Sequence, residues 1–261
     1  MVKKINKVVN RTGKKIVKKA LEIKGKKAEA EKDFKQFKMT IDMRDLLKAG
    51  CHLGHKTAKT NPKARENIYI NKDGIEIFDL GKTIIGLQAA CDYVYNLKRS
   101  GKQIVFVGTK RQSREVIRRV AMDCNMGFVT ERWLGGTISN WTEIKKNISK
   151  LNTIKEGLEK GKFKESTKKE LSQIKKKMAR LEKMIGGLTN LVKLPEALVV
   201  VDAGGEKTAV KEAIGVGIKV VAITDTDFNP FKVDYAIPAN DDNVKSISII
   251  IEELGKAVKS G

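Results

Sequence analysis

Short apolar runs alternate with longer amphipathic stretches along most of the chain. Five runs rich in β-branched and other apolar residues predict strands at Ile75–Phe78, Ile104–Val107, Gly127–Val129, Ala197–Val201 and Lys219–Ile223. Apolar residues at helical spacing predict helices at about 82–99, 111–122, 206–215 and 242–257, so each strand except the third is followed by a helix. This alternation predicts an α/β fold with a doubly wound parallel sheet, flavodoxin-like or Rossmann-like.

Two further helices are expected between the third and fourth strands. One apolar stripe with helical spacing comprises Ile144, Ile148, Leu151, Ile154 and Leu158. A second stripe, whose spacings alternate between three and four residues as in a coiled coil, comprises Leu171, Ile174, Met178, Leu181, Ile185 and Leu188. Thr167 and Glu170 have the spacing of a capping box at the start of the second helix. We therefore expect an antiparallel coiled-coil hairpin at 142–187, inserted into an α/β domain formed by 39–141 and 188–261. A solvated two-helix spacer is the alternative.

The net charge is concentrated in two segments. The 261 residues include 53 Lys and Arg against 31 Asp and Glu, which gives a formal charge of +22 at pH 7. Residues 1–40 hold 14 basic and 4 acidic side chains, and residues 143–185 hold 14 basic and 6 acidic ones, so the remaining body is nearly balanced. Such an excess opposes compaction unless a polyanion neutralises it, which favours nucleic acid or an anionic membrane surface as the partner.

Residues 1–38 are expected to form a basic N-terminal extension with apolar residues at roughly helical spacing. Three interpretations of it remain open: an arm that wraps RNA and orders on binding, a solvated tail, or a membrane-surface or targeting segment. No run approaches the ~18 consecutive apolar residues that span a bilayer. The cysteines, Cys51, Cys91 and Cys124, match neither a disulfide framework nor a Cys-x-x-Cys pair, so we expect a cytoplasmic protein.

Sequence signals for catalysis are weak. The chain has no Gly-x-x-x-x-Gly-Lys-Ser/Thr loop, no Gly-x-Gly-x-x-Gly after a strand, no Gly-x-Ser-x-Gly elbow and no His-Glu-x-x-His. The turn Gly108–Ser113 combines backbone N–H groups with Lys110 and Arg111, which suits RNA backbone, a free nucleotide or a structural turn. Three acidic residues that follow strands favour cap and turn roles over Mg²⁺ binding: Asp202, Asp225 and Asp227.

Metal binding is not expected either. A zinc site needs about four donors, and the chain offers three close together: Cys51, His52 and His55. We expect a structural role for them and no metal or cofactor, with an incidental metal left open.

Both tryptophans, Trp133 and Trp141, lie between the third strand and the expected hairpin. Packing between hairpin and body is favoured for them over base stacking, which remains the alternative for Trp133. Asn140, with Glu143 three residues later, is expected to cap the first helix of the hairpin.

Several separate motifs carry a family resemblance. In chain order they are Ala49-Gly50-Cys51-His52-Leu53-Gly54-His55, Asn61-Pro62-Lys63, Phe106-Val107-Gly108-Thr109-Lys110, Arg132-Trp133-Leu134-Gly135-Gly136 with Asn140-Trp141, Leu194-Pro195, Ile237-Pro238 and Asn240-Asp241-Asp242. Their order and spacing resemble those of the S-two family of small-ribosomal-subunit proteins in its bacterial or organellar form. The resemblance runs from about Met39 to the C-terminus and does not include residues 1–38.

The resemblance implies a flavodoxin-like domain with an inserted helical hairpin and no catalytic activity. It implies a structural constituent of the small ribosomal subunit that supports translation and lies on the solvent side between head and body. The implied partners are small-subunit ribosomal RNA and neighbouring small-subunit ribosomal proteins, with no membrane and no small-molecule substrate. A nucleotide-binding enzyme on the same fold and a membrane-surface protein using residues 1–38 are the rival interpretations.

Basic residues in three places are the candidates for contacts with RNA phosphates. Those in the loop after the histidines are Lys56, Lys59, Lys63 and Arg65. Those in the turn after the second strand are Lys110 and Arg111. Those on the expected hairpin are Lys145, Lys146, Lys175 and Lys176. Each contact would release counterions from the RNA, so we expect binding to weaken steeply with salt.

Overall fold

A computed structural model describes residues 35–161, 163 and 167–261 of the chain. Expectations for residues 1–34 therefore lie outside the described residues, as do those for 162 and 164–166 in the expected hairpin. Residues Phe37–Gly261 form one compact unit. No helix in the described part of the chain has both the length and the apolar content to cross a membrane.

A five-stranded sheet forms the centre of this unit. Its strands are β4 (Ile104–Val107), β5 (Gly127–Val129), β6 (Ala197–Val201), β7 (Lys219–Thr224) and β8 (Tyr235–Pro238). They lie in the order β5-β4-β6-β7-β8, and every neighbouring pair is parallel. Counted along the chain, this is the order 2-1-3-4-5 of flavodoxin-like doubly wound sheets. The predicted α/β class with a parallel sheet is confirmed.

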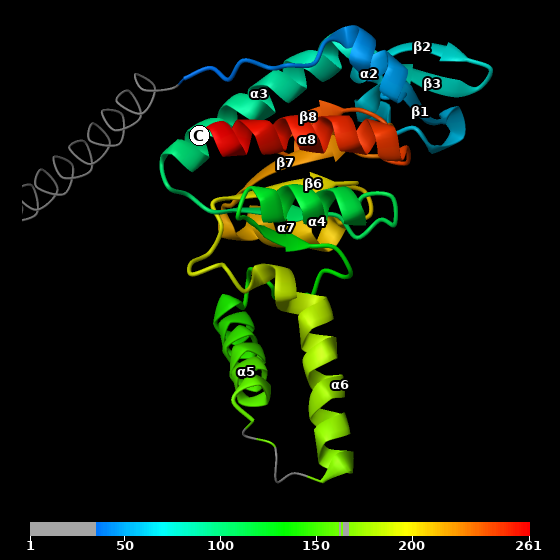
Figure 1. The fold of residues 1–261 in the computed structure, drawn as a ribbon. Coiled ribbons are helices and arrows are strands. Elements are labelled where there is room, and N and C mark those ends of the chain that lie inside the picture. The colour runs from blue at the N-terminus through cyan, green and yellow to red at the C-terminus, as the bar shows by residue number, and fades with distance from the viewer. Residues whose placement is uncertain (1–34, 162, 164–166) are drawn as a thin grey trace, which may run out of the picture. The chain divides into compact units, whose positions relative to one another are not determined.

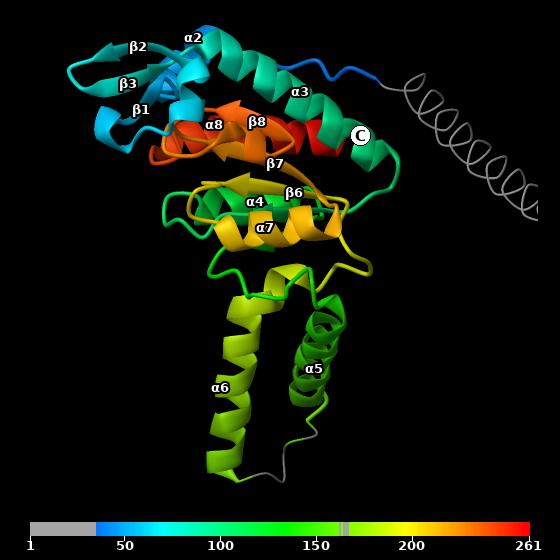
Figure 2. The ribbon, with the colours of Figure 1, turned by 180° about the vertical axis from the view of Figure 1, so that it is seen from behind.

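Helices cover both faces of the parallel sheet (Figures 1 and 2). Four of them are α3 (Leu80–Arg99), α4 (Arg114–Asp123), α7 (Lys207–Val216) and α8 (Val244–Ser260). On one face lie α3, α4 and α8, and α7 lies on the opposite face. A shorter helix, α2 (Met43–Ala49), contacts α3 and α8. The helices predicted after the strands are present, although α4 begins three residues later than expected.

Side chains of the central strands alternate between two hydrophobic cores. In β4, Ile104 and Phe106 point into the core shared with α3, α4 and α8, whereas Val105 and Val107 point into the core shared with α7. All four residues are at most 2% exposed. Burying such a side chain contributes about 1.5–3 kcal/mol, so both faces of the sheet need their helices. Burial on both faces also explains why these strands are continuous apolar runs in the sequence.

The strand predicted at Ile75–Phe78 forms, but it does not join the parallel sheet. It is β3, the middle strand of a separate antiparallel sheet with β1 (Leu53–Lys56) and β2 (Ile68–Lys72). Asp73 and Gly74 connect β2 to β3, and both have positive φ angles, 52° and 78°. An Asp-Gly pair in this conformation produces a tight hairpin, which requires antiparallel pairing. The expectation that this strand belongs to the parallel sheet was therefore wrong.

The sequence pattern did not predict strand β8. Tyr235–Pro238 has only four residues and ends in proline, which cannot donate a backbone hydrogen bond and so weakens the strand signal. In the structure β8 is an edge strand whose partner in the parallel sheet is β7. An edge position tolerates proline because one side of the strand needs no partner.

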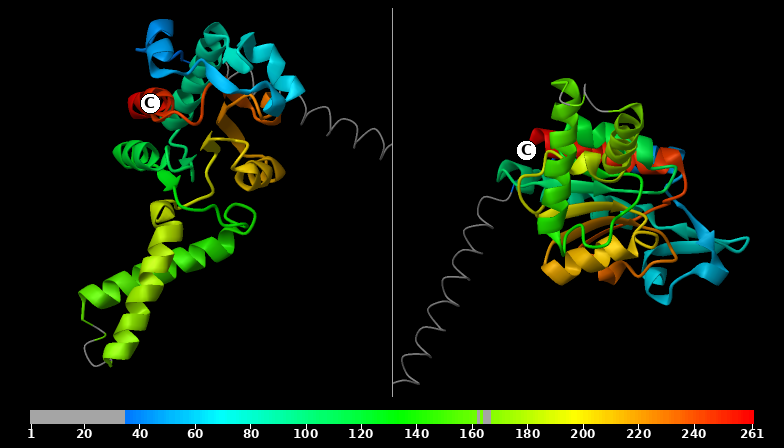
Figure 3. Two further views of the ribbon diagram at one scale, coloured as in Figure 1. Left: turned by 90° about the vertical axis from the view of Figure 1, so that its right-hand side faces the viewer. Right: turned by 90° about the horizontal axis from the view of Figure 1, so that it is seen from below.

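Two helices, α5 (Trp141–Glu159) and α6 (Lys168–Ile185), lie between β5 and β6 in the chain. They contact each other and extend away from the sheet (Figures 1, 2 and 3). Their end nearest the sheet is apolar, and the residues there that are at most 7% exposed are Ile144, Ile148, Leu151 and Ile185. The same core includes the sheet side chains that face α7 and Leu188 of the short helix η3 (Gly186–Leu188). Coiled-coil packing along the rest of the two helices stays a prediction.

The two helices start in different ways. At α6, the Thr167 hydroxyl accepts a hydrogen bond from the N–H of Glu170, and the Glu170 carboxylate accepts one from the N–H of Thr167. The expected capping box is thus confirmed. At α5, the Asn140 side chain makes no capping hydrogen bond, so the expected cap was wrong. The N–H groups just before α5 are bound by a carboxylate of another helix instead.

Glu212 of α7 holds the segment that leads into α5. Its carboxylate accepts hydrogen bonds from the N–H groups of Gly136 (2.7 Å), Ile138 (3.1 Å) and Ser139 (3.4 Å) and from the indole N–H of Trp133 (3.4 Å). Burial alone would raise the pKa of Glu212, but these donors lower it below its usual value. Trp133 is 7% exposed and packs in the core on the α7 face, which confirms the expected packing role.

Glu212→Ala is expected to lower the free energy of unfolding by about 2–4 kcal/mol, since it removes a charged acceptor shared by five donors, which include the Ser139 hydroxyl. Glu212→Gln should lose less at neutral pH. Because folding lowers the pKa of Glu212, its stabilisation is present above the unfolded pKa and is lost as pH falls through the folded one, so wild type and Gln variant should converge in acid. Urea denaturation followed by tryptophan fluorescence measures these differences.

The matched control is Glu252→Gln, which removes the charge of a surface carboxylate paired with Arg119. An exposed ion pair contributes about 0–1 kcal/mol, so this variant should stay close to wild type. If Glu212→Ala unfolds at the same urea concentration as the control, Glu212 does not hold the junction.

Candidate functional site

Segments far apart in the sequence meet at the C-terminal ends of the parallel strands. Asn240, which follows β8, donates its backbone N–H to the carbonyl oxygen of Cys51 (3.1 Å) and its side-chain amide to that of Leu53 (2.7 Å). The side-chain amide of Asn243 donates to the carbonyl oxygen of Ala49 (3.2 Å). Two sequence motifs that are 187 residues apart at Leu53 and Asn240 therefore form one polar structure.

Two glycines make this close approach possible. Gly50 ends α2 with a φ of 78°, and a Cβ there would lie 2.8 Å from Nδ2 of Asn243. A Cβ on Gly54 would lie 2.6 Å from Cγ2 of Thr226 and 3.0 Å from the carbonyl oxygen of Glu76. A side chain at Gly50 would push the two motifs apart, and one at Gly54 would push β1 away from Thr226 and from β3.

Lys110, which follows β4, is surrounded by carboxylates. Its Nζ lies 2.6 Å from Oδ1 of Asp241, 2.7 Å from Oδ1 of Asp242 and 3.3 Å from Oδ2 of Asp202. Burial by itself lowers the pKa of Lys110, but the hydrogen bonds to Asp241 and Asp242 and the nearby charges raise it well above its usual value. Since Asp202 follows β6 and the other two acids follow β8, this single ammonium group joins the ends of three strands.

Among these acids, the pKa of Asp241 is raised most strongly. Its side chain is 3% exposed, and burial, together with the charge of Asp202, raises its pKa to about 7 against the opposing effect of Lys110. Asp225 is 1% exposed and accepts the backbone N–H of Asp241 (3.3 Å). Asp202 accepts the N–H of Gly205 (2.7 Å) within its own loop. The bond to Gly205 confirms the turn role expected for Asp202, whereas the carboxylate of Asp225 binds the loop after β8.

His55 connects β1 to the same group of acids. Its Nδ1 lies 2.9 Å from Oδ1 of Asp225, without the alignment of a hydrogen bond, and its Nε2 lies 3.4 Å from Oδ2 of Asp242. Burial lowers the pKa of His55, but Asp225, Asp227 and Asp241 together raise it more, so the ring binds a proton more readily than a free histidine. Cys51 is fully buried, and burial raises the pKa of its thiol, which disfavours the reactive thiolate. Across residues 35–161, 163 and 167–261, no three His, Cys, Asp or Glu side chains are placed to hold a metal ion.

Polar groups of the turn Gly108–Ser113 bind other residues of the protein. The N–H of Thr109 donates to Oε1 of Glu206 (2.9 Å), and the ammonium group of Lys110 contacts three carboxylates. The N–H of Thr109 and the ammonium group of Lys110 therefore already have partners, whereas Arg111 of the same turn is exposed. This geometry favours the structural-turn interpretation over a nucleotide or an RNA phosphate.

The loop after β1 carries four of the predicted basic residues, all exposed: Lys56, Lys59, Lys63 and Arg65. It contains the short helices η1 (Thr57–Lys59) and η2 (Pro62–Asn67). The N–H of Asn61 donates to the carbonyl oxygen of Thr226 (2.7 Å), which anchors the loop to the end of β7. Within the described residues none of the four, nor the exposed Arg111, has an ion pair, although Nζ of Lys63 lies 5.9 Å from the ring centroid of Phe231.

The basic residues predicted on the hairpin lie on α5 and α6 and are exposed: Lys145, Lys146, Lys175 and Lys176. Nζ of Lys146 lies 2.5 Å from Oε1 of Glu143 in an exposed pair, which binds weakly. The other three have no ion pair within the part of the chain that is described. The structure thus separates the predicted residues into a group beside the strand ends and a group on the two helices.

The sequence did not predict the carboxylates around Lys110. A signal was present, because Asp202, Asp241 and Asp242 follow strands or strand-like segments, and parallel strands end at a common edge. Because β8 was not predicted, Asp241 and Asp242 were not recognised as residues that follow a strand.

Asp241 is expected to make stability depend on pH near neutrality. Its folded pKa of about 7 lies above the ~3.9 of an unfolded aspartate, so between these values the folded state binds a proton that the unfolded state lacks. Stability should therefore fall as pH rises through this window. We expect wild type to lose on the order of 1–3 kcal/mol more than Asp241→Asn between pH 5 and pH 8 in urea denaturation.

His55 contributes a loss of the same sign in both proteins, because its folded pKa is also raised and its stabilisation disappears as pH rises through that value. Asp234→Asn, which changes a partly exposed acid paired with Lys219, is the control. Identical pH dependence of wild type and Asp241→Asn would show that Asp241 is ionised throughout.

Known proteins share this chain's sequence over most of its length. A family model described as ribosomal protein S2 matches residues 46–261. The chain is 44% identical over 223 residues to the small ribosomal subunit protein uS2 of Amoebophilus asiaticus, covering 85% of this chain and 71% of the relative. The proteins of the same name from Opitutus terrae and Treponema pallidum are 40% and 39% identical over 223 and 218 residues, covering 85% and 84% of this chain and 74% and 75% of the relatives. With the motifs at the strand ends, these matches confirm the resemblance, and the chain belongs to the ribosomal protein S2 family, whose members are structural and non-enzymatic.

Proposed function

We propose that the chain binds ribosomal RNA and neighbouring ribosomal proteins within the small ribosomal subunit, on the solvent side between head and body. Membership of the ribosomal protein S2 family gives it a structural role in the ribosome. We place it on cytoplasmic ribosomes, where it supports translation without a cofactor, a small-molecule substrate or a membrane.

The local excess of basic side chains carries this proposal, because residues 143–185 hold 14 basic and 6 acidic residues, whereas residues 41–142 and 186–261 are nearly balanced. Several basic residues of the body have carboxylate partners within the chain: Lys102, Lys110, Lys219, Lys256 and Lys259. The segment 56–65 and the helices α5 and α6 also present exposed cations without such partners in the described residues, among them Lys145, Lys175 and Lys176. Cations that the fold leaves unpaired are available to RNA phosphates, whose neutralisation releases counterions.

The proposed phosphate contacts form two groups. Beside the strand ends they are Lys56, Lys59, Lys63, Arg65 and Arg111, and on the helices they are Lys145, Lys146, Lys175 and Lys176. Lys110 stays a predicted contact, but its three carboxylate partners favour a role in joining the strand ends.

We also propose the domain organisation expected from the sequence. Residues 39–141 and 188–261 form the α/β body, 142–187 form an inserted coiled-coil hairpin, and 1–38 form a basic extension. The apolar end of α5 and α6 shares a core with the sheet, which supports a hairpin that is fixed to the body and reaches outward.

Replacing Lys145, Lys146, Lys175 and Lys176 together with Glu should weaken binding to small subunits that lack this protein. Each lost phosphate contact lowers the slope of log K against log salt by about 0.7–0.9, so a loss of four contacts should flatten the slope by roughly 3. Sucrose-gradient sedimentation of subunits mixed with tagged full-length protein, at several salt concentrations, measures both quantities.

A matched comparison uses two double variants with the same charge change. Lys175→Glu with Lys176→Glu alters α6, and Lys207→Glu with Lys211→Glu alters exposed positions of α7 outside the proposed contacts. The α6 pair should reduce binding and the α7 pair should not. Unchanged binding of the quadruple variant would remove the helices from the RNA interface, and a wild-type protein that stays at the top of the gradient at low salt would reject the proposed function.

A further inference from the structure

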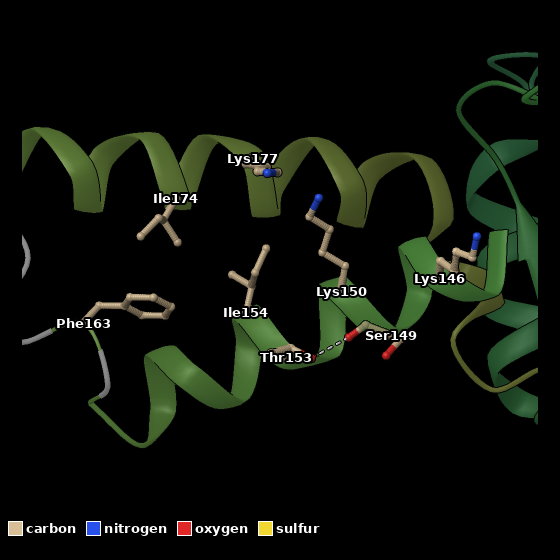
Figure 4. Close-up of a pocket in the computed structure, with 8 residues that line it drawn as sticks. All are labelled: Lys146, Ser149, Lys150, Thr153, Ile154, Phe163, Ile174 and Lys177. Carbon is tan, nitrogen blue, oxygen red and sulfur yellow. Dashed lines mark hydrogen bonds between the residues drawn. The ribbon is translucent and has the colours of Figure 1, made fainter. Parts of the chain in front are cut away.

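A groove of about 450 Å³ lies between α5 and α6 (Figure 4). Lys150 and Ile154 line it from α5, Ile174 and Lys177 line it from α6, and Phe163 lies at its outer end. The isoleucines are only half-buried here. Leu151, which follows Lys150 on α5, is instead fully buried in the core that the helices share with the sheet, so the groove opens where the apolar stripe meets lysine.

Two positive charges meet in this groove. In Figure 4, Lys150 reaches from α5 toward α6, where Lys177 lies. Contact with the Lys150 ammonium group, and repulsion by it, lower the pKa of Lys177 below its usual value. Among the residues that the structure describes, no carboxylate lines the groove. Two like charges are thus held together at a position where nothing in the described chain neutralises them.

Neighbouring lysines on the same helices do have acidic partners. Lys146 lies 2.5 Å from Glu143, and Lys155 lies 2.7 Å from Glu182 across the two helices. The chain therefore supplies acids along this interface and omits one between Lys150 and Lys177. An anion bound from outside would accept hydrogen bonds from both ammonium groups and remove their repulsion.

We propose that Lys150 and Lys177 together bind one phosphate group of an RNA backbone in the groove between α5 and α6. This rests on the proposed function and adds two contacts that the sequence did not single out. The excess of 14 basic over 6 acidic residues across 143–185 favours a polyanion over a single small anion. A nucleic-acid strand can also place its other phosphates near Lys175 and Lys176 on the outer surface of α6, whereas an isolated anion cannot.

Lysine NMR of the full-length protein, labelled with ¹³C at the lysine side chains, tests this directly. Titration with the hexanucleotide hexauridylate at about 50 mM salt should shift the Lys150 and Lys177 signals saturably and raise the pKa of Lys177. Lys150→Gln should weaken hexauridylate binding about 5–10-fold, the loss that one contact with a slope near −0.7 gives at this salt. It should also abolish the response of Lys177.

Lys169→Gln, on α6 but outside the groove and outside the proposed contacts, is the matched control and should leave the Lys177 response intact. Circular dichroism checks that both variants keep their helices. Parallel shifts of all the lysines on α5 and α6, or an unchanged Lys177 response in Lys150→Gln, would overturn the proposal. So would saturation by inorganic phosphate or by a hexaglutamate peptide at a lower concentration than hexauridylate, because the occupant would then be a free anion or an acidic protein segment.

The subunit-sedimentation experiment separates this proposal from the proposed function. Wild-type protein that fails to bind subunits while its groove still responds to hexauridylate would reject only the proposed function. If the protein binds subunits normally but Lys150 and Lys177 do not respond to hexauridylate, only the proposed phosphate site in the groove is rejected.

Discussion

The parallel sheet must be buried on both faces, and the other features of the structure follow from this constraint. In β6, Val199 points toward the helices α3, α4 and α8, and Val200 points toward α7. Both are at most 1% exposed. Because neither face can meet water, helices have to cover both, and polar residues are displaced to the strand ends and to the helices that extend outward. Those two places hold all the predicted RNA contacts of the described chain.

At the strand ends, this arrangement gathers the residue types of an enzyme active site. Their polar groups, however, bind one another. In α/β sheets, ligands bind where loops after parallel strands meet, and here those loops carry aspartates and a lysine, with His55 of β1 beside them. Lys110 and the acids neutralise one another, and the glycines at 50 and 54 allow the β1 loop to close over them. A fold used by many enzymes therefore serves here as a rigid support, in agreement with the family's structural role.

The position of a lysine in the fold decides whether an acidic side chain pairs with it or whether it is left available to RNA. The total of +22 has little meaning by itself, because many body lysines form ion pairs. On α5 and α6, the acids pair with only some of the lysines, and the remaining ammonium groups face solvent or one another. Stability and RNA affinity thus depend on different lysines, which allows them to be changed separately.

The sequence alone determined the class of the fold, the order along the chain of strands β4 to β7 and their helices, and the family. Continuous apolar runs, helical stripes and the Thr167–Glu170 capping box depend on neighbours within a few residues, so they can be read directly from the order of amino acids. It also located the excess charge, because charge is a property of composition.

Only the tertiary structure decided which strands pair and which cations are free. The strand at Ile75–Phe78 paired with its hairpin neighbour instead of the parallel sheet, and β8 required β7 beside it to form. Glu212 replaced Asn140 in binding the N–H groups before α5, and Lys110 found its acids on loops more than 90 residues away in sequence. These contacts join residues whose separation along the chain says nothing about their distance, so they are set by the packing of the sheet and its helices.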